Sequence, residues 1–73
     1  MKKKIGITCD IYKANSFRKG LLKDGFTLEY DGQSGIKDVH LFRVEVSEKV
    51  YDEMVKRIGK TVRRLELEFK HSN

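Results

Sequence analysis

The chain lacks the sequence patterns that most directly identify a metal site, a disulfide framework or a membrane span. Its single cysteine, Cys9, can form no disulfide within the chain, and no Cys-x-x-Cys pair or zinc-type spacing is present. No run of about 18 apolar residues occurs, so we expect no membrane-spanning segment and no membrane partner. These absences predict a protein of a reducing, cytoplasmic compartment that holds no metal and no cofactor.

Side chains arranged for catalysis are also scarce. Ser16 and Ser34 have no identifiable base, and His40 is an isolated histidine near a loop. The glycine-rich stretch 31–35 lacks the lysine of a phosphate-binding loop, so we interpret it as a hairpin turn. We therefore expect no enzyme activity, apart from a nuclease hypothesis that involves Asp10.

The length of the chain limits its architecture. With 73 residues it has room for one small domain, which we expect to span residues 1–73. A domain of this size buries roughly 60% of its unfolded surface, which is enough for one layer of sheet against one layer of helices. Charged residues make up 37% of the chain and apolar residues 38%. Because the apolar residues are periodic, we expect an ordered fold.

Alternation of apolar and polar residues predicts four β-strands. In the second, Thr27 and Glu29 alternate with larger apolar residues and are expected on the outer face of the sheet. The fourth is predicted because two leucines and a phenylalanine alternate with charged residues. The four predicted strands cover residues 5–9, 26–30, 39–46 and 64–70.

Apolar residues at helical spacing predict two helices, Ile11–Leu22 and Val50–Ile58. Each is followed by a glycine that is expected to end it, Gly25 for the first and Gly59 for the second. Ser47 is placed to cap the second helix.

The order strand–helix–strand–strand–helix–strand resembles the ferredoxin-like βαββαβ plait. The resemblance covers almost the whole chain, and it lies in the order of elements and not in a sequence motif. It implies an α+β fold with a four-stranded antiparallel sheet and both helices on one face. Because unrelated functions share this architecture, the resemblance says little about activity.

The positive charge of the chain is concentrated near its start. The net charge is +5, and residues 1–24 hold seven Lys or Arg and two Asp. Residues 25–73 hold nine Lys or Arg and nine Asp or Glu, which cancel. A localised excess of charge indicates an acidic partner more strongly than a uniform one does.

The outer faces of the two predicted helices differ in charge. The second carries opposite charges four positions apart, which neutralise one another. The first has no acid on its exposed stripe, so we predict that it docks an acidic protein, with Tyr12 as an aromatic anchor, or the phosphates of a nucleic acid. A merely solvated face is the alternative. The predicted contact residues are Tyr12, Lys13, Ser16, Lys19 and Lys23, together with Lys2, Lys3 and Lys4.

The sheet face away from the helices is expected to carry a mildly apolar patch of Val39, Leu41 and Arg43, ringed by charges of both signs. This patch is a candidate homodimer face, and scattered surface residues without a function are the alternative. Thr8 and Leu41 occupy the region where RNA-recognition domains of this architecture place base-stacking rings, so we do not expect base stacking there.

Asp10 lies where the first predicted strand ends. The segment Ile7-Thr8-Cys9-Asp10, followed by a helix and then by Leu22-Lys23-Asp24-Gly25-Phe26, is similar to the small CRISPR-associated subunit that helps integrate spacers. The similarity covers about residues 4–30. It implies a dimer in which Asp10 binds Mg²⁺ across the dimer axis for nuclease activity. The alternative is that Asp10 only caps the following helix.

Three functions are therefore open from the sequence. The leading hypothesis is a small non-enzymatic binding protein, of an accessory or inhibitor type, that docks on an acidic macromolecule through its basic first helix. The second is direct nucleic-acid binding through the lysine-rich first third of the chain. The third is a dimeric Mg²⁺-dependent nuclease that uses Asp10.

Overall fold

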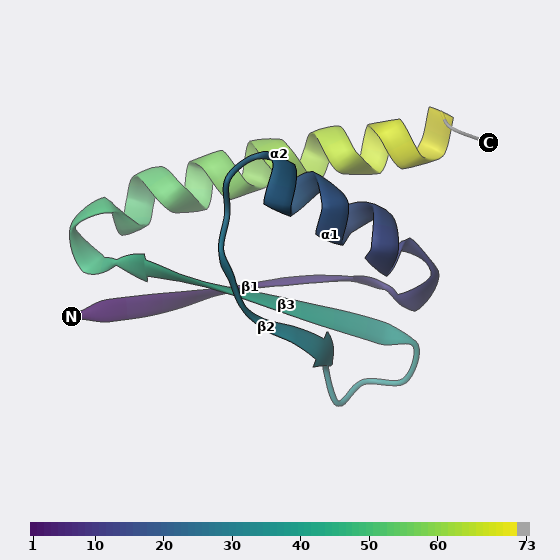
Figure 1. Ribbon diagram of the computed structural model, residues 1–73, viewed down its shortest axis with the longest axis horizontal. Coiled ribbons are helices and arrows are strands. Elements are labelled where there is room, and N and C mark those ends of the chain that lie inside the picture. Colours follow the sequence, from purple (N-terminus) through teal and green to yellow (C-terminus); the bar gives the residue numbers. More distant parts are fainter. Residues whose placement is uncertain (72–73) are drawn as a thin grey trace.

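The computed structural model describes residues 1–71 and contains a three-stranded antiparallel sheet with both α-helices on one of its faces (Figure 1). Short 3₁₀ turns, η1 and η2, precede the two helices. The elements follow one another as β1 (Lys2–Asp10), η1 (Ile11–Lys13), α1 (Ala14–Lys23), β2 (Leu28–Gln33), β3 (Val39–Ser47), η2 (Glu48–Val50) and α2 (Tyr51–His71).

The sheet has the strand order β1-β3-β2, with β3 in the centre and antiparallel to both neighbours. The crossover through α1 therefore joins two outer strands that run in the same direction. This arrangement confirms an α+β fold with an antiparallel sheet and two helices. It also shows that the prediction of a four-stranded sheet is wrong for the part of the chain that the structure describes, residues 1–71.

The predicted fourth strand, residues 64–70, belongs to the last part of α2. This helix is 21 residues long and continues through Gly59 without a break. Helical spacing explains this, because Ile58, Thr61 and Leu65 are buried at intervals of three and four residues. Gly59 lies on the exposed side, where an added Cβ would meet nothing within 4 Å, so it does not end the helix. Leu67, which the strand prediction placed inward, is 52% exposed.

The first predicted helix closely matches the observed helical segment, but the observed segment begins with a 3₁₀ turn. Its first three residues form η1, and α1 follows directly. Gly25 closes the helix with φ of 91°, as expected, and the Phe26 N–H donates to the Leu21 carbonyl at 3.1 Å. Ile11 and Leu22, which the helical spacing placed on the apolar face, are each 53% exposed.

Strand β2 contains an irregularity that changes which side chains face the helices. Leu28 lies opposite Val44, but Tyr30 lies opposite Arg43, so one residue is extra at this point. Tyr30 is therefore shifted to the open face of the sheet, and Asp31 is shifted to the helical side. A strict alternation from Thr27 and Glu29 does not predict this reversal.

The core lies between the sheet and the helices. Among residues 1–71, four side chains are completely enclosed there, two from α1 and two from the central strand β3: Phe17, Leu21, Phe42 and Val44. On β3 the residues at every second position are buried, as the sequence predicts for one covered face.

The two helices meet where Gly20 of α1 lies against Leu65 of α2. A Cβ on Gly20 would lie 2.1 Å from Leu65 Cδ2 and 3.1 Å from its Cγ, which is too close for any side chain. Leu65 is itself only 5% exposed, so it has little space in which to move away. Glycine at this position therefore permits the close approach of the helices, and any larger residue would force Leu65 to shift, although glycine lowers the intrinsic stability of α1.

We predict that Gly20→Ala lowers the free energy of unfolding by about 1–3 kcal/mol, because it forces overpacking against Leu65. Gly59→Ala is the matched control, since both glycines are inside helices. It should raise the stability by about 0.5–1 kcal/mol, because the added methyl group meets no neighbour and favours the helix. Urea denaturation of both variants measures the difference, and stabilisation by Gly20→Ala would contradict this helix contact.

Candidate functional site

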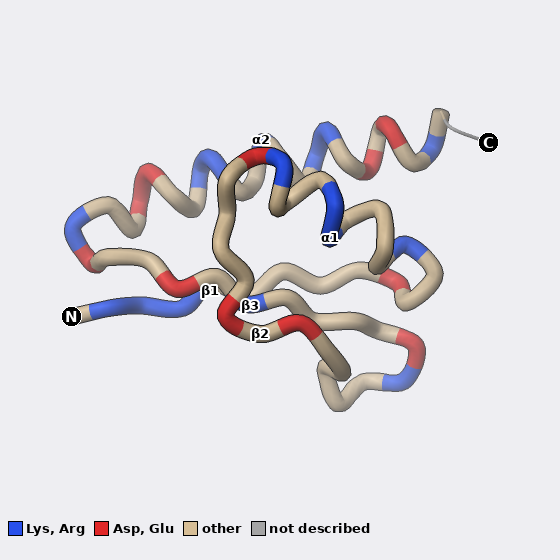
Figure 2. The backbone as a smooth tube through the Cα atoms, in the orientation of Figure 1, with Lys and Arg blue, Asp and Glu red and all other residues tan. Residues whose placement is uncertain are grey.

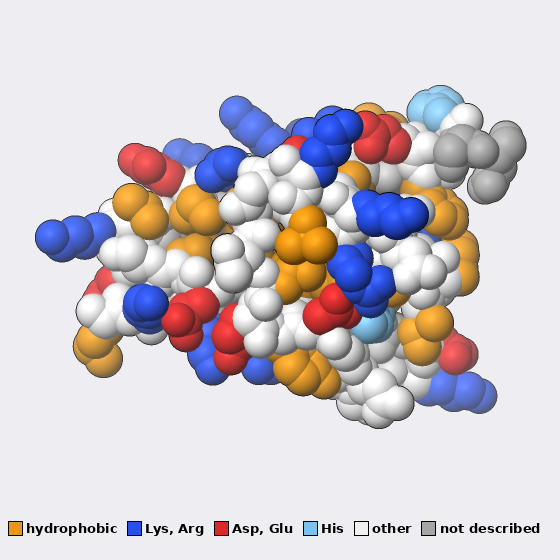
Figure 3. All heavy atoms as spheres, in the orientation of Figure 1, with side chains coloured by type: hydrophobic (Ala, Val, Ile, Leu, Met, Phe, Trp, Pro, Cys, Tyr) orange, Lys and Arg blue, Asp and Glu red, His pale blue; other side chains and the backbone are white. Residues whose placement is uncertain are grey.

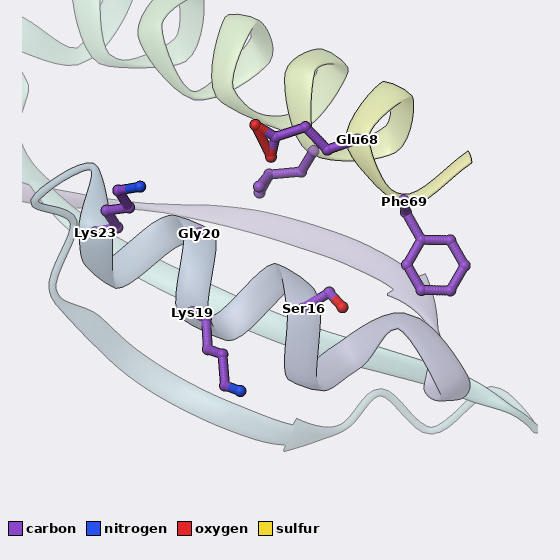
Figure 4. A pocket seen from close by; sticks show the side chains of 7 residues that line it. Ser16, Lys19, Gly20, Lys23, Glu68 and Phe69 are labelled. Atoms are coloured by element: carbon purple, nitrogen blue, oxygen red, sulfur yellow. The ribbon is translucent and has the colours of Figure 1, made fainter. Parts of the chain in front are cut away.

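A groove of about 320 Å³ lies between α1 and the C-terminal half of α2 (Figure 4). It exists because Gly20 and Leu65 hold the helices close together, while the side chains on either side of that contact are longer. Three of the predicted contact residues, all on α1, line it. The lining residues are Ser16, Lys19, Gly20 and Lys23 from α1 and Leu65, Glu68 and Phe69 from α2.

The groove has an apolar floor and a charged rim. Leu65 is buried and Phe69 is half-buried, whereas Lys19 and Lys23 are exposed. In Figure 4, Lys23 and Glu68 extend into the space between the helices, and Lys19 extends away from α2. Within residues 1–71, neither lysine forms an ion pair, while Glu68 lies 3.5 Å from Arg64. Both lysines can therefore contact an acidic ligand without first losing a partner.

A second hollow of about 330 Å³ adjoins the groove at Phe69. The Tyr12 ring, 70% exposed, lies at 5.7 Å from the Phe69 ring centroid and forms part of this hollow. The Lys13 amine donates to Glu66 at 3.0 Å and lies 3.9 Å from Asp10. The Glu66 hydrogen bond raises the pKa of Lys13. Lys13, which lies at the edge of the predicted acid-free stripe, is therefore paired with an acid from α2.

The three N-terminal lysines do not join this surface. They lie at the start of β1, opposite the end of β3, whereas α1 follows the other end of β1 (Figure 2). Lys2 lies 3.5 Å from Glu45, Lys4 lies 3.1 Å from Glu29, and the Lys3 amine lies 4.9 Å from the Tyr51 ring centroid. The basic first third of the sequence is thus divided between two ends of the molecule.

The middle of α2 carries a basic segment that the sequence analysis missed. Residues 56–64 hold five Lys or Arg and no acid, and lysine and arginine side chains gather over the helices in Figure 3. The second helix predicted from the sequence ends at Ile58, and this prediction places half of the basic segment in a loop and a strand. The five residues are Lys56, Arg57, Lys60, Arg63 and Arg64.

Asp24 joins this basic segment to the end of α1. Its carboxylate lies 3.0 Å from Arg64 and accepts a hydrogen bond from the Thr61 hydroxyl at 2.8 Å. Arg57 donates to the Asp24 carbonyl oxygen at 2.9 Å. The hydrogen bonds from Arg64 and from Thr61 lower the pKa of Asp24. The acid that follows Lys23 in the sequence is therefore used to hold the helices together.

A second polar cluster fastens α1 to the sheet, and it also has no counterpart in the sequence analysis. Arg18 donates to both carboxylate oxygens of Asp31, and the Nη2 bond is 2.9 Å long. His40 Nε2 lies 2.6 Å from Asp31 Oδ1. The Arg18 hydrogen bond, with a smaller contribution from His40, lowers the pKa of Asp31 to about 2. The irregularity in β2, which turns Asp31 toward the helices, creates this cluster.

The open face of the sheet carries the predicted dimer patch together with an aromatic ring. Val39, Leu41 and Arg43 lie there, all half-buried. The Arg43 guanidinium lies 5.1 Å from the Tyr30 ring centroid, and Arg43 Nη1 lies 3.7 Å from Glu29. The patch is therefore partly occupied by contacts within the chain, and its use in a dimer stays a prediction.

Asp10 occupies the position before η1, but its carboxylate makes no capping hydrogen bond. The interpretation of Asp10 as a side-chain cap is therefore wrong, whereas Ser47 accepts from the Lys49 N–H at 3.3 Å as predicted. Among residues 1–71, no three His, Cys, Asp or Glu side chains converge to hold a metal ion. The nuclease hypothesis, which invokes a second subunit, stays a prediction.

Cys9 is buried, and that burial is the main reason why the pKa of its thiol is raised.

In the part of the chain that the structure describes, no helix is both long and apolar enough to cross a membrane. No protein-family model, no curated protein and no solved structure matches this chain. The groove, the basic segment of α2 and the faces of the sheet are the candidate functional surfaces of the protein.

We predict that Asp31→Asn lowers the free energy of unfolding by about 1 kcal/mol at neutral pH, because it removes the ion pair with Arg18. The loss is small because solvent screens part of this ion pair. The folded pKa of about 2 lies below the ordinary value of 3.8, so this stability is present above about pH 4 and is lost toward pH 2. Urea denaturation at neutral pH and near pH 2 measures the free energy of unfolding under the two conditions. Asp52→Asn, at an exposed acid, is the control, and a loss that is equal at both pH values would contradict the account.

Proposed function

We propose that the protein is a small binding module that docks an acidic segment of another protein in the groove between α1 and α2. The observation that carries this proposal is an apolar floor of Leu65 and Phe69 beside two exposed lysines that have no acidic partner within residues 1–71. An amphipathic segment with apolar and acidic residues matches both features. Contact energy at such interfaces comes mainly from apolar side chains that fill a pocket, while charge directs orientation and association rate.

The adjoining hollow extends the proposed contact surface. Tyr12 is exposed beside Phe69 and is placed to cover an apolar side chain of the partner. Lys13 contributes less as a charge, because Glu66 already neutralises it. The predicted anchor and stripe therefore have a modified role in this proposal, in which Lys19 and Lys23 supply the free charge and α2 supplies the apolar floor.

Nucleic-acid binding is the second candidate, favoured by the basic segment 56–64 on α2. Lys60 and Arg63 are exposed and form no ion pair within the described residues. Phosphates would contact this outer side of α2 and not the groove, and affinity would fall steeply with salt. The two candidates therefore use different residues of the same helical layer.

A synthetic amphipathic peptide of alternating leucine and glutamate pairs is a suitable probe for the groove. We predict that the double variant Lys19→Glu/Lys23→Glu weakens its binding about tenfold or more, because two favourable contacts become repulsive. Lys37→Glu, at an exposed lysine of the β2–β3 loop, is the charge control and should bind normally. Fluorescence anisotropy measures the affinity, and NMR shift changes should cluster at Ser16, Gly20 and Leu65.

A different set of results would contradict peptide binding in the groove and would favour nucleic-acid binding by α2. In that case a duplex or single-stranded oligonucleotide would bind with a steep salt dependence, and Lys60→Glu/Arg63→Glu would weaken it more than Lys19→Glu/Lys23→Glu does. Equal peptide affinity for the groove variant and the Lys37→Glu control would also contradict the proposal.

A further inference from the structure

The outer edge of β1 has no neighbouring strand within residues 1–71, because β1 pairs only with β3. An edge strand exposes a row of backbone N–H and C=O groups that can pair with another chain. This edge is nine residues long. It is separate from the groove, so pairing through this edge is independent of the function proposed for the groove.

The hydrogen bonds at the two ends of the β1–β3 ladder show which residues of β1 face outward. The Glu48 N–H donates to the Met1 carbonyl at 3.1 Å, and the Ile11 N–H donates to the Asp38 carbonyl at 3.0 Å. Since hydrogen-bonded and non-hydrogen-bonded residues alternate along an antiparallel pair, the odd-numbered residues bond to β3. The even-numbered residues direct their N–H and C=O groups to the free edge, and all of them are exposed: Lys2, Lys4, Gly6, Thr8 and Asp10.

These five residues are complementary to themselves when two copies of β1 run antiparallel. With Gly6 opposite Gly6 of the second copy, every outward-facing residue lies opposite another outward-facing residue. The backbone groups of these residues can then form on the order of ten hydrogen bonds in total. Lys2 then lies opposite Asp10, and Lys4 lies opposite Thr8. No two like charges face each other in this register. Shifting the register by two residues in either direction leaves Lys2 or Asp10 without an opposite residue.

The flank of α2 above this edge carries two valines beside the acidic residue Glu66. Tyr51 contacts Lys3 at one end of β1 and Glu66 contacts Lys13 just past the other, so α2 runs along β1. Helical spacing places Val55 and Val62 on the flank opposite the one that meets α1. Val55 is 41% exposed and Val62 is half-buried. Pairing of two β1 edges brings two such flanks together.

We propose that two copies of this chain associate through β1 to form one continuous six-stranded sheet, in a symmetric dimer with Gly6 at its axis. The two copies present the same residues to each other, as a two-fold interface requires. This surface differs from the open-face patch of Val39, Leu41 and Arg43. Because the association is non-covalent, the dimer is in a concentration-dependent equilibrium with the monomer.

Disulfide trapping tests the register directly. In a Cys9→Ala background, Gly6→Cys places two thiols at the axis, where the Cα atoms of a hydrogen-bonded pair are about 5.5 Å apart, within the range that a disulfide spans. The new Cβ lies 3.6 Å from Leu41 Cδ1, an ordinary contact, so the variant is expected to fold. Mild oxidation should give a covalent dimer. Thr27→Cys in the same background is the exposed control and should stay monomeric.

A charge exchange tests the same register without a cross-link. Asp10→Lys alone places lysines opposite each other at both ends of the paired strands and should weaken dimerisation about tenfold. The double variant Lys2→Glu/Asp10→Lys exchanges the two charges and should restore it. Sedimentation velocity over a concentration series measures the monomer–dimer equilibrium. A monomer at every concentration, equal cross-linking of both cysteine variants, or a double variant as weak as Asp10→Lys would each overturn the proposal.

Discussion

The close contact of Gly20 with Leu65 is the constraint on which the other features depend. It brings α1 and α2 together at one point, with 2.1 Å between the place of a Cβ on Gly20 and Leu65 Cδ2. Because Leu65 points toward α1 from a continuous helix, residues 64–70 are not part of the sheet. The interhelical groove and the Asp24 bonds to Thr61 and Arg64 depend on the same helical arrangement, which also leaves the outer edge of β1 without a neighbouring strand within residues 1–71.

The order β1, α1, β2, β3 and the start of α2 could be predicted from the sequence because the apolar periods and the residues that end these elements are recognisable. Gly25 ends α1, and Ser47 caps the start of the second helical segment. The last segment could not be assigned in this way, since Leu65, Leu67 and Phe69 fit a strand while Ile58, Thr61 and Leu65 fit a helix. The absence of turn residues between Gly59 and Leu65 was the signal that favoured the helix.

The candidate site was predictable only on its α1 side. Ser16, Lys19 and Lys23 share one stripe by helical spacing alone, and the structure keeps them on one groove. Their neighbours from α2 depended on the helical state of residues 60–71, so the floor of the groove and the Lys13–Glu66 ion pair were not predictable. Asp31 was misplaced for a different reason, because a single extra residue in β2 reverses the alternation of side chains.

The most direct test of this account is an NMR measurement of backbone chemical shifts and NOEs for residues 60–70 of the free protein. We expect helical carbon shifts throughout this segment and NOEs between the Gly20 α-protons and the Leu65 methyl groups. Strand-type shifts, together with cross-strand NOEs from this segment to β1, would contradict it.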